Sequence, residues 1–130
     1  MTYEFYMNQK KLEQNYMEAI DEFKKRLSPH CKLFIYFQKE PKKAFSKNHY
    51  HILIKKGRAT FSSLEFADKI KELTQNEHST IVFLIGYSKI TFDEIISVSQ
   101  LDFSHSTTLL LLLEQIYRSY TIHMGKMYHK

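Results

Sequence analysis

The sequence predicts a single domain, residues 1–130, of the α/β class: a mostly parallel, five-stranded sheet with helices on both faces. Two observations lead to this fold class. Segments with strand-like and helix-like hydrophobic patterns alternate along the chain. Several of the strand-like segments are almost continuously apolar, which is typical of strands buried on both faces of a parallel sheet. The length of 130 residues suits one hydrophobic core.

The first part of the chain predicts two strands with a helix between them. Residues 2–8, TYEFYMN, are aromatic and β-leaning, so they predict a strand. From Lys10 to Leu27 apolar residues recur at helical spacing, and Ser28-Pro29 ends that helix. The inward positions are Leu12, Tyr16, Ala19, Ile20, Phe23 and Leu27. Residues 31–38, CKLFIYFQ, predict a buried strand.

The middle of the chain predicts a loop, a strand and a helix. Residues 39–48 are basic and interrupted by proline, so they predict a loop. Residues 49–56 predict a third strand, which Gly57 closes. Ser62 or Ser63 can cap the helix that follows. Its inward residues are Leu64, Phe66, Ala67, Ile70 and Leu73.

The last part of the chain predicts two strands and two helices. Residues 80–86, TIVFLIG, are β-branched and end in glycine, which indicates a strand. Residues 91–99 predict a short helix, and residues 101–108 predict a brief strand or loop. The expected buried side of the short helix is Phe92, Ile95 and Ile96. A helix that opens with five consecutive leucines, residues 109–113, then completes the order.

The composition restricts the class of partner. A net charge of +5 and a pI near 9.2 favour polyanions such as nucleic acid, although a lysine-rich surface kept for solubility explains them equally well. No apolar run reaches the roughly 18 residues that span a bilayer, and the first residues do not resemble a signal peptide, so no membrane is expected. The single cysteine, Cys31, fits a reducing compartment, so we expect a cytoplasmic protein.

Three predicted strand ends indicate where a ligand would bind. In open parallel sheets, ligands sit beyond the carboxyl ends of the strands. Those ends are residues 55–57, 86–88 and 103–105, and we expect them to converge on one site. Gly86 can let a ligand approach the backbone, although a lone glycine more often only ends a strand. The chain contains no phosphate-binding loop and no G-x-G-x-x-G motif.

The candidate metal and nucleophile residues are weak. His49 and His51 would share one face of a strand, but a third ligand at a usable spacing is missing, so no metal is expected. His30 and Cys31 are adjacent on an extended segment, where neighbouring side chains point to opposite faces. They therefore do not form a nucleophile and its base.

Residues 81–106 and 110–130 resemble the RlmH-type ribosomal large-subunit pseudouridine N3-methyltransferases of the SPOUT superfamily. In that family an apolar strand ends in Ile-Gly-Gly, a Leu-Ser-Phe-Ser-like stretch follows, and the last helix carries Glu-Gln-x-Tyr-Arg. Residues 114–118, EQIYR, match the helix motif, and residues 125–130, GKMYHK, match the family's final Gly-x-x-Tyr-His-basic motif. Residues 16–33 resemble the family's first helix and second strand.

The resemblance implies a SPOUT-like domain with a C-terminal trefoil knot, which works as a homodimer and needs no metal. The implied reaction is methylation of N3 of a pseudouridine in 23S rRNA within the ribosome, with S-adenosylmethionine (SAM) bound in the knot. The implied cofactor-binding residues are Leu53, Gly57, Gly86, Tyr87, Ser104, His105, Ser106 and Thr107. The implied catalytic residues are His129 and Tyr128, and the implied RNA-binding residues are Arg118, Tyr128, His129 and Lys130.

The chain departs from the family pattern at three places. Tyr87 replaces the second glycine at the strand end, the stretch between Phe103 and Leu109 is shorter, and Met124 replaces an arginine. These departures leave two alternatives open. One is a SPOUT-fold homodimer that binds rRNA without methyl transfer. The other is an unrelated small α/β protein whose leucine helix only forms a dimer.

Overall fold

The computed structural model shows a parallel sheet with five strands in the order β2-β1-β4-β3-β5. It describes all residues except 40, 42–47, 58–59, 77–79 and 126–130. The strands are β1 (Thr2–Met7), β2 (Lys32–Phe37), β3 (His49–Ile54), β4 (Thr80–Ile85) and β5 (Glu94–Ile96). The helices are α1 (Gln14–Leu27), α2 (Ser63–Gln75) and α3 (His105–His123). The predicted α/β class and the five-stranded parallel sheet are confirmed.

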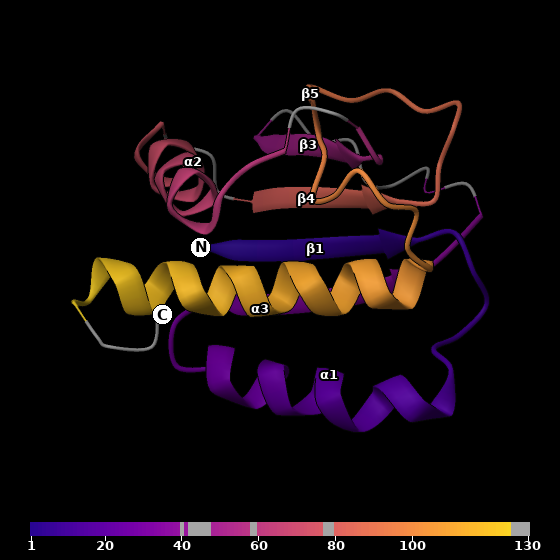
Figure 1. Cartoon of the computed structure of the whole chain (residues 1–130), viewed down its shortest axis with the longest axis horizontal. Coiled ribbons are helices and arrows are strands. Elements are labelled where there is room, and N and C mark those ends of the chain that lie inside the picture. The colour runs from indigo at the N-terminus through magenta and orange to yellow at the C-terminus, as the bar shows by residue number, and fades with distance from the viewer. Residues whose placement is uncertain (40, 42–47, 58–59, 77–79, 126–130) are drawn as a thin grey trace.

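The four long strands end level with one another. Met7 of β1 pairs with Phe37 of β2 on one side and with Ile85 of β4 on the other, and Ile85 pairs with Ile54 of β3. The arrows of the strands in Figure 1 accordingly point to the same edge, on the right of the view. The segments that leave these strands therefore begin side by side along this carboxyl edge.

The helices of the described residues share one face of the sheet, so the expectation of helices on both faces is wrong. A single hydrophobic core joins Phe5 and Phe83 of the sheet to Leu27 of α1, Ile70 of α2 and Leu112 of α3. The opposite face carries a smaller apolar cluster that has no helical member. That second cluster consists of Tyr6, Leu53, Val82, Leu84 and Tyr87. One of the predicted helices, residues 91–99, is absent, and the others all contribute to the first core.

The leucine run is explained by the position of α3. This helix crosses the sheet between α1 and α2, as Figure 1 shows, and packs against both. Leu109, Leu112 and Leu113 are buried, whereas Leu110 and Leu111 are half-buried. A helix with a sheet beneath it and a helix on either side can be apolar over most of its circumference.

The segment 91–99 forms a strand instead of the predicted helix. Its residues Glu94–Ile96 pair with β3, and they are held by side chains as well as by the backbone. Glu94 accepts a hydrogen bond from the Tyr50 hydroxyl (2.6 Å) and pairs with Lys69 (2.8 Å), while Asp93 accepts from the backbone N–H of His51 (2.8 Å). Of the expected inward residues only Ile96 is buried, which is why the helical pattern misled. Residues 101–104 form no strand, and α3 begins at His105.

The start of α2 matches its prediction. Ser62 is the cap, and its hydroxyl accepts from the backbone N–H of Glu65 while the Glu65 carboxylate accepts from the backbone N–H of Ser62. This reciprocal pair is a capping box. Among the described residues, none of the helices has both the length and the hydropathy to cross a membrane.

Candidate functional site

A cavity of about 390 Å³ lies at the carboxyl edge of the sheet, between the strand ends and the beginning of α3. Residues from all three segments that the sequence singled out contribute to its walls. The lining residues are Ile54, Lys55, Lys56, Ile85, Gly86, Tyr87, Val98, Ser99, Leu101, Asp102, Phe103, His105 and Thr108. The cavity therefore combines an apolar floor, made by the strand ends, with polar groups from the loops and α3.

Gly86 and His105 meet at the centre of this edge. Gly86 has a φ of +89°, which residues with a Cβ rarely adopt. A Cβ on Gly86 would lie 2.5 Å from Cε1 of His105, so the imidazole ring rests directly on the glycine. The side-chain amide of Asn8 donates to the carbonyl oxygen of Gly86 (2.9 Å) and fixes the peptide that follows β4.

Tyr87 contributes to the cavity wall, but its ring belongs to the second cluster on the opposite face. Its hydroxyl donates a hydrogen bond to the carbonyl oxygen of Gln38, at the end of β2. Burial raises the pKa of Tyr87 to about 12. The ring that replaces the family's second glycine is thus anchored away from the centre of the cavity.

The segments after β3 and β5 lie in direct contact. The backbone N–H of Gly57 donates to the carbonyl oxygen of Ser99 (3.1 Å), and that of Lys55 donates to the carbonyl oxygen of Ile96 (3.2 Å). A Cβ on Gly57 would lie 2.4 Å from the hydroxyl oxygen of Ser97, so glycine lets the two segments approach without displacing this side chain. Gly57 supports the wall without lining the cavity, and Leu53 points to the opposite face, in the second cluster.

The hydroxyl residues at the start of α3 fasten the helix to the segment before α1. Ser104 caps α3, because its hydroxyl accepts from the backbone N–H of Thr107 (3.2 Å). The Ser106 hydroxyl donates to the carboxylate of Glu13 and accepts from the side-chain amide of Gln9 (3.1 Å). The Thr107 hydroxyl contacts the hydroxyl of Tyr16. These three sequence-predicted residues therefore position the cavity wall and do not line it.

The sequence reasoning missed the loop between β5 and α3. Val98, Ser99, Leu101 and Asp102 line the cavity, yet Val98 and Ser99 were expected in a helix, and Leu101 and Asp102 in a brief strand or loop with no assigned role. A strand at 94–96 would have marked the following residues as a carboxyl-end loop. The charged groups at the cavity are Lys55, Lys56, Asp102 and the titratable His105.

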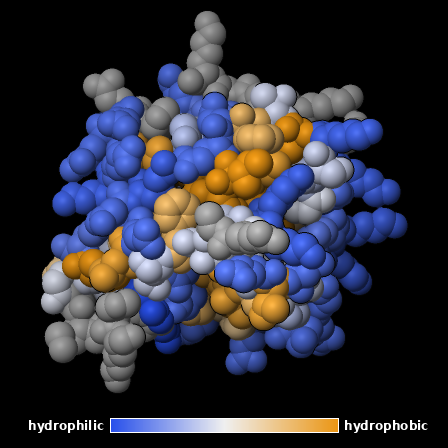
Figure 2. All heavy atoms as spheres, turned by 45° about the horizontal axis from the view of Figure 1, so that its top comes forward, coloured by the Kyte–Doolittle hydropathy of each residue, from blue (hydrophilic) through white to orange (hydrophobic). Residues whose placement is uncertain are grey.

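Apolar side chains are exposed around β5 and on the loop after it. Leu101 is 69% exposed and Ile95 48% exposed, and Phe92 and Phe103 are also exposed. Figure 2 turns this side of the molecule forward and shows hydrophobic side chains gathered among hydrophilic ones. A second, smaller cavity of about 130 Å³ lies beside it, between α2 and the Leu111–Gln115 part of α3.

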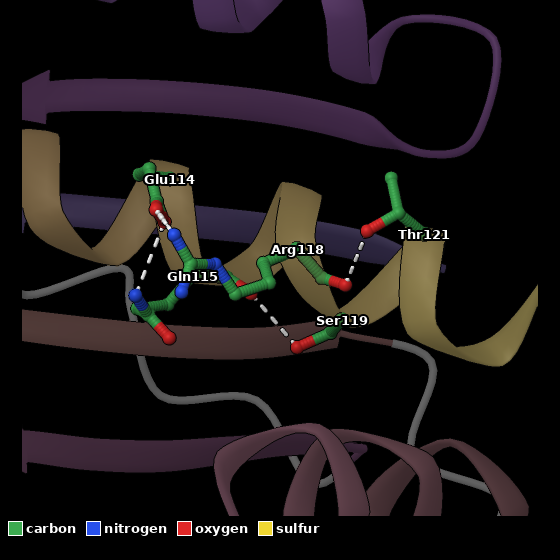
Figure 3. A network of polar contacts seen from close by, with 5 residues as sticks. All are labelled: Glu114, Gln115, Arg118, Ser119 and Thr121. Atoms are coloured by element: carbon green, nitrogen blue, oxygen red, sulfur yellow. Dashed lines mark hydrogen bonds and ion pairs between the residues drawn. The ribbon is translucent and has the colours of Figure 1, made fainter. Parts of the chain in front are cut away.

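Arg118 lies in a polar network on the half-buried outer side of α3 (Figure 3). Its guanidinium donates to the carboxylate of Glu114 (2.6 Å), one turn earlier, and the Gln115 side chain donates to the same carboxylate (3.1 Å). The hydroxyl of Thr121 donates to the carbonyl oxygen of Arg118 (2.7 Å). Arg118 is 13 residues from His105 on one helix, or about 20 Å, so the two residues do not belong to one site within a subunit.

The remaining residues that the sequence singled out are the C-terminal tail and the two histidines of β3. Tyr128, His129 and Lys130 lie outside the described residues. His49 and His51 share a face as expected, with ring centroids 6.3 Å apart, and Nδ1 of His51 lies 3.2 Å from a carboxylate oxygen of Asp93. The described part of the chain contains no group of three or more side chains that could hold a metal ion.

A parallel sheet with a cavity at its carboxyl edge, beside the start of the last helix, is typical of α/β proteins that bind a ligand at that edge. The model of the family described as "Predicted SPOUT methyltransferase" matches residues 1–129. The chain belongs to the SPOUT methyltransferase family. The alternative of an unrelated α/β protein is therefore excluded.

The chain is similar over nearly its whole length to members of this family that are named as rRNA methyltransferases. The chain is 35% identical to "Ribosomal RNA large subunit methyltransferase H 1" of Thermoanaerobacter sp. (strain X514), over 133 residues that cover 100% of both chains. It is 35% identical to "Ribosomal RNA large subunit methyltransferase H" of Clostridioides difficile (strain 630), over 92% of this chain and 94% of the other. The relative of that name from Finegoldia magna is 36% identical over the same shares. A full-length match within 133 residues shows that the compact chain length is shared with a relative.

Proposed function

We propose that this chain transfers a methyl group from SAM to N3 of a pseudouridine in 23S rRNA of the ribosome, in the cytoplasm. The observation that carries the proposal is the carboxyl-edge cavity built around Gly86, in a chain of the SPOUT methyltransferase family. Curated relatives that match it over nearly the whole length are named as rRNA large subunit methyltransferases. The shared name gives the class of RNA, and the resemblance of residues 114–118 and 125–130 to the RlmH type gives the nucleotide.

The residues at the cavity fit SAM. The volume of the cavity, about 390 Å³, lies in the range of pockets that hold small cofactors. Ile54, Ile85 and Val98 offer an apolar surface to an adenine ring, and the Asp102 carboxylate and the Ser99 hydroxyl offer partners for hydroxyl and ammonium groups. A side chain at position 86 would collide with the His105 ring, so glycine at this position allows both residues to line the cavity side by side.

We assign the residues near the cavity two kinds of role. Gly86, Tyr87 and His105 would contact the cofactor, because they line the cavity. Five more residues would hold those walls in place through the contacts described above. These five are Leu53, Gly57, Ser104, Ser106 and Thr107.

When bound, SAM supplies a methyl group on a positively charged sulfonium, which is already an activated donor. The work left to the protein is to hold the nucleobase nitrogen in line and to accept its proton. We assign the role of proton acceptor to His129, because histidine is the side chain that best accepts a proton near neutrality. Tyr128, the preceding residue, is the second catalytic residue that we propose. Lys130 and Arg118 would contact RNA phosphates.

The active form would be a homodimer, because the C-terminal tail cannot reach the cavity of its own subunit. The cavity lies at the first residue of α3, and the tail leaves the other end of this 19-residue helix, about 28 Å away. The five residues after Gly125 extend over at most about 17 Å. Tyr128, His129 and Lys130 would therefore complete the site of a second subunit.

The half-buried outer side of α3 is the surface on which we place the dimer contact. It carries Leu110, Leu111 and Ile122 together with the Glu114–Arg118 ion pair. Two copies of one helix face can pack against each other around a two-fold axis. The half-exposed leucines would then be covered.

We also propose that the chain is knotted. β5 lies at the outer edge of the sheet, yet the chain returns from it to the middle of the sheet to form α3. On this way back it passes against Gly57, at the segment that follows β3. Threading of α3 through the loop between β3 and β4 would account for this close passage.

The test is methyl transfer to ribosomes from cells that lack the modification. Purified protein is incubated with these ribosomes and SAM labelled in its methyl group, and the label in 23S rRNA is counted. We expect label that saturates near one methyl group per ribosome. The second candidate, a homodimer that binds rRNA without catalysis, is favoured by the His105 ring resting on Gly86 inside the cavity. It predicts ribosome binding with no label, so the same samples separate the two functions.

A further inference from the structure

Exposed lysines follow the carboxyl end of each of the four long strands. Lys10 and Lys11 follow β1, and Lys39 follows β2. The lysines that follow β3 are Lys55 and Lys56, and the lysine that follows β4 is Lys89. We call these six residues the lysine rim. All six side chains are exposed.

The register of the sheet places the lysine rim along one edge. Met7, Phe37, Ile54 and Ile85 are paired across the four strands, so the segments that follow them begin in one row. Adjacent strands lie about 4.8 Å apart, and the row from β2 to β3 is therefore about 14 Å wide. Two members of the rim, Lys55 and Lys56, line the cavity, and the other four lie on segments that begin in the same row.

The acidic groups at this edge do not balance the rim. Among the described residues of these segments they are Glu13, Asp93 and Asp102. Glu13 accepts a hydrogen bond from Ser106, Asp93 accepts from the backbone N–H of His51, and Asp102 faces the cavity. Two of the three carboxylates, those of Glu13 and Asp93, are thus occupied locally, while all six lysines of the rim are exposed to solvent.

We propose that the lysine rim binds the phosphate backbone of single-stranded RNA on either side of the target nucleotide and holds that nucleotide over the cavity. This inference rests on the proposed function, and it adds the surface on which the substrate lies. Lysine ammonium groups are point charges that suit phosphates irrespective of sequence, which fits a positioning role and not the reading of bases. A single-stranded segment suits this geometry, because a base stacked inside a duplex must first be turned out before it can enter a cavity at a sheet edge.

Two double variants with equal charge changes test the rim. Lys10→Gln/Lys11→Gln removes two charges of the rim without changing a residue that lines the cavity. Lys24→Gln/Lys25→Gln removes two exposed charges at the C-terminal end of α1, which lies at the opposite edge of the sheet in Figure 1. The probes are a single-stranded RNA oligonucleotide of mixed sequence, measured at several salt concentrations, and ribosomes in the methyl-transfer reaction. Calorimetry with S-adenosylhomocysteine (SAH), the demethylated cofactor, is run on all three proteins to show that the cavity is intact.

We expect the rim variant to bind the oligonucleotide about tenfold more weakly, with a salt slope reduced by about 1.4 for two lost phosphate contacts. Its KM for ribosomes should rise while kcat stays close to that of the unchanged protein. The α1 variant should change each value less than twofold. Equal losses of RNA affinity in both variants would contradict the proposed role of the lysine rim, because the change in net charge alone would then explain them.

The outcomes also separate the rim from the proposed function. If the unchanged protein methylates ribosomes and the rim variant has the same KM and salt slope, the rim is wrong and the function stands. If instead the unchanged protein shows no methyl transfer while only the rim variant loses RNA affinity, the RNA-binding role of the lysine rim is confirmed and the proposed methyl transfer is wrong.

Discussion

The imidazole ring of His105 rests on the Cα of Gly86, so closely that a Cβ on this glycine would lie 2.5 Å from Cε1 of the ring and 2.7 Å from Nε2. This contact joins the end of β4 to the first residue of α3 across the cavity. It depends on glycine twice, because the φ of +89° disfavours any other residue and the ring leaves no room for a side chain.

Gly86→Ala should therefore damage both stability and cofactor binding. The strained φ alone costs about 1–3 kcal/mol of the free energy of unfolding, and the methyl group pushes His105 out of position. Denaturant unfolding measures the first effect and calorimetry with SAH measures the second. His105→Ala and the double variant Gly86→Ala/His105→Ala complete a cycle in which the steric part of the loss should be recovered. Additive effects in the double variant would contradict a direct contact.

Tyr87→Phe should destabilise the protein by about 1 kcal/mol, because it removes the hydrogen bond from the Tyr87 hydroxyl to the Gln38 carbonyl oxygen. The pKa of Tyr87 is raised to about 12 in the folded state, so its contribution is complete below pH 10 and is lost as the pH rises through 12. Unfolding curves for both proteins between pH 8 and about pH 11 measure the difference. A variant as stable as the unchanged protein would show that the hydroxyl is not paired.

Ser106→Ala should raise the pKa of Glu13. The hydrogen bond from the Ser106 hydroxyl is the main cause that lowers the pKa of Glu13 below its usual 4.5, with a smaller effect from His105. A lowered pKa means that this carboxylate stabilises the fold above pH 4.5 and that the stabilisation disappears as the pH falls through the lowered value. NMR titration of the Glu13 side chain in both proteins gives the two pKa values directly. Identical values would remove the proposed anchor of α3.

A mixture of two inactive proteins should regain methyl-transfer activity if the tail completes the partner's site. Gly86→Ala inactivates the cavity of its own subunit, and His129→Ala inactivates the tail. After subunit exchange, each mixed dimer keeps one intact cavity opposite one intact tail, so about a quarter of the normal activity should return. Each protein alone serves as the control. No recovery after confirmed exchange would mean that the tail acts within its own subunit.

The hydrophobic periodicity of the sequence was sufficient to predict the long helices and strands. Strands such as residues 80–85 and helices such as α1 and α2 carry a hydrophobic pattern that depends mainly on burial, and each was found in its expected place. β5 could not be recognised in this way, because it is three residues long and its position depends on partners far away in sequence. Glu94 is held by Tyr50 and Lys69, and neither contact leaves a local signal.

The position of the cavity was predictable, while the roles of its residues were predictable only in part. The location of Gly86 and His105 at the cavity could be predicted from the rule that ligands bind at the carboxyl ends of parallel strands. The direction of the Tyr87 ring does not, because it is set by the second cluster and by the end of β2. Ser106 was expected at the cofactor, but its hydroxyl is used by Glu13 and Gln9.

Calorimetric titration of the protein with SAH tests most directly whether the carboxyl-edge cavity is the cofactor site. We expect one binding site per chain with an affinity in the micromolar range, and loss of the heat signal in the Gly86→Ala protein. Absence of heat from the unchanged protein at millimolar SAH, or undiminished binding by the Gly86→Ala protein, would contradict this account of the cavity.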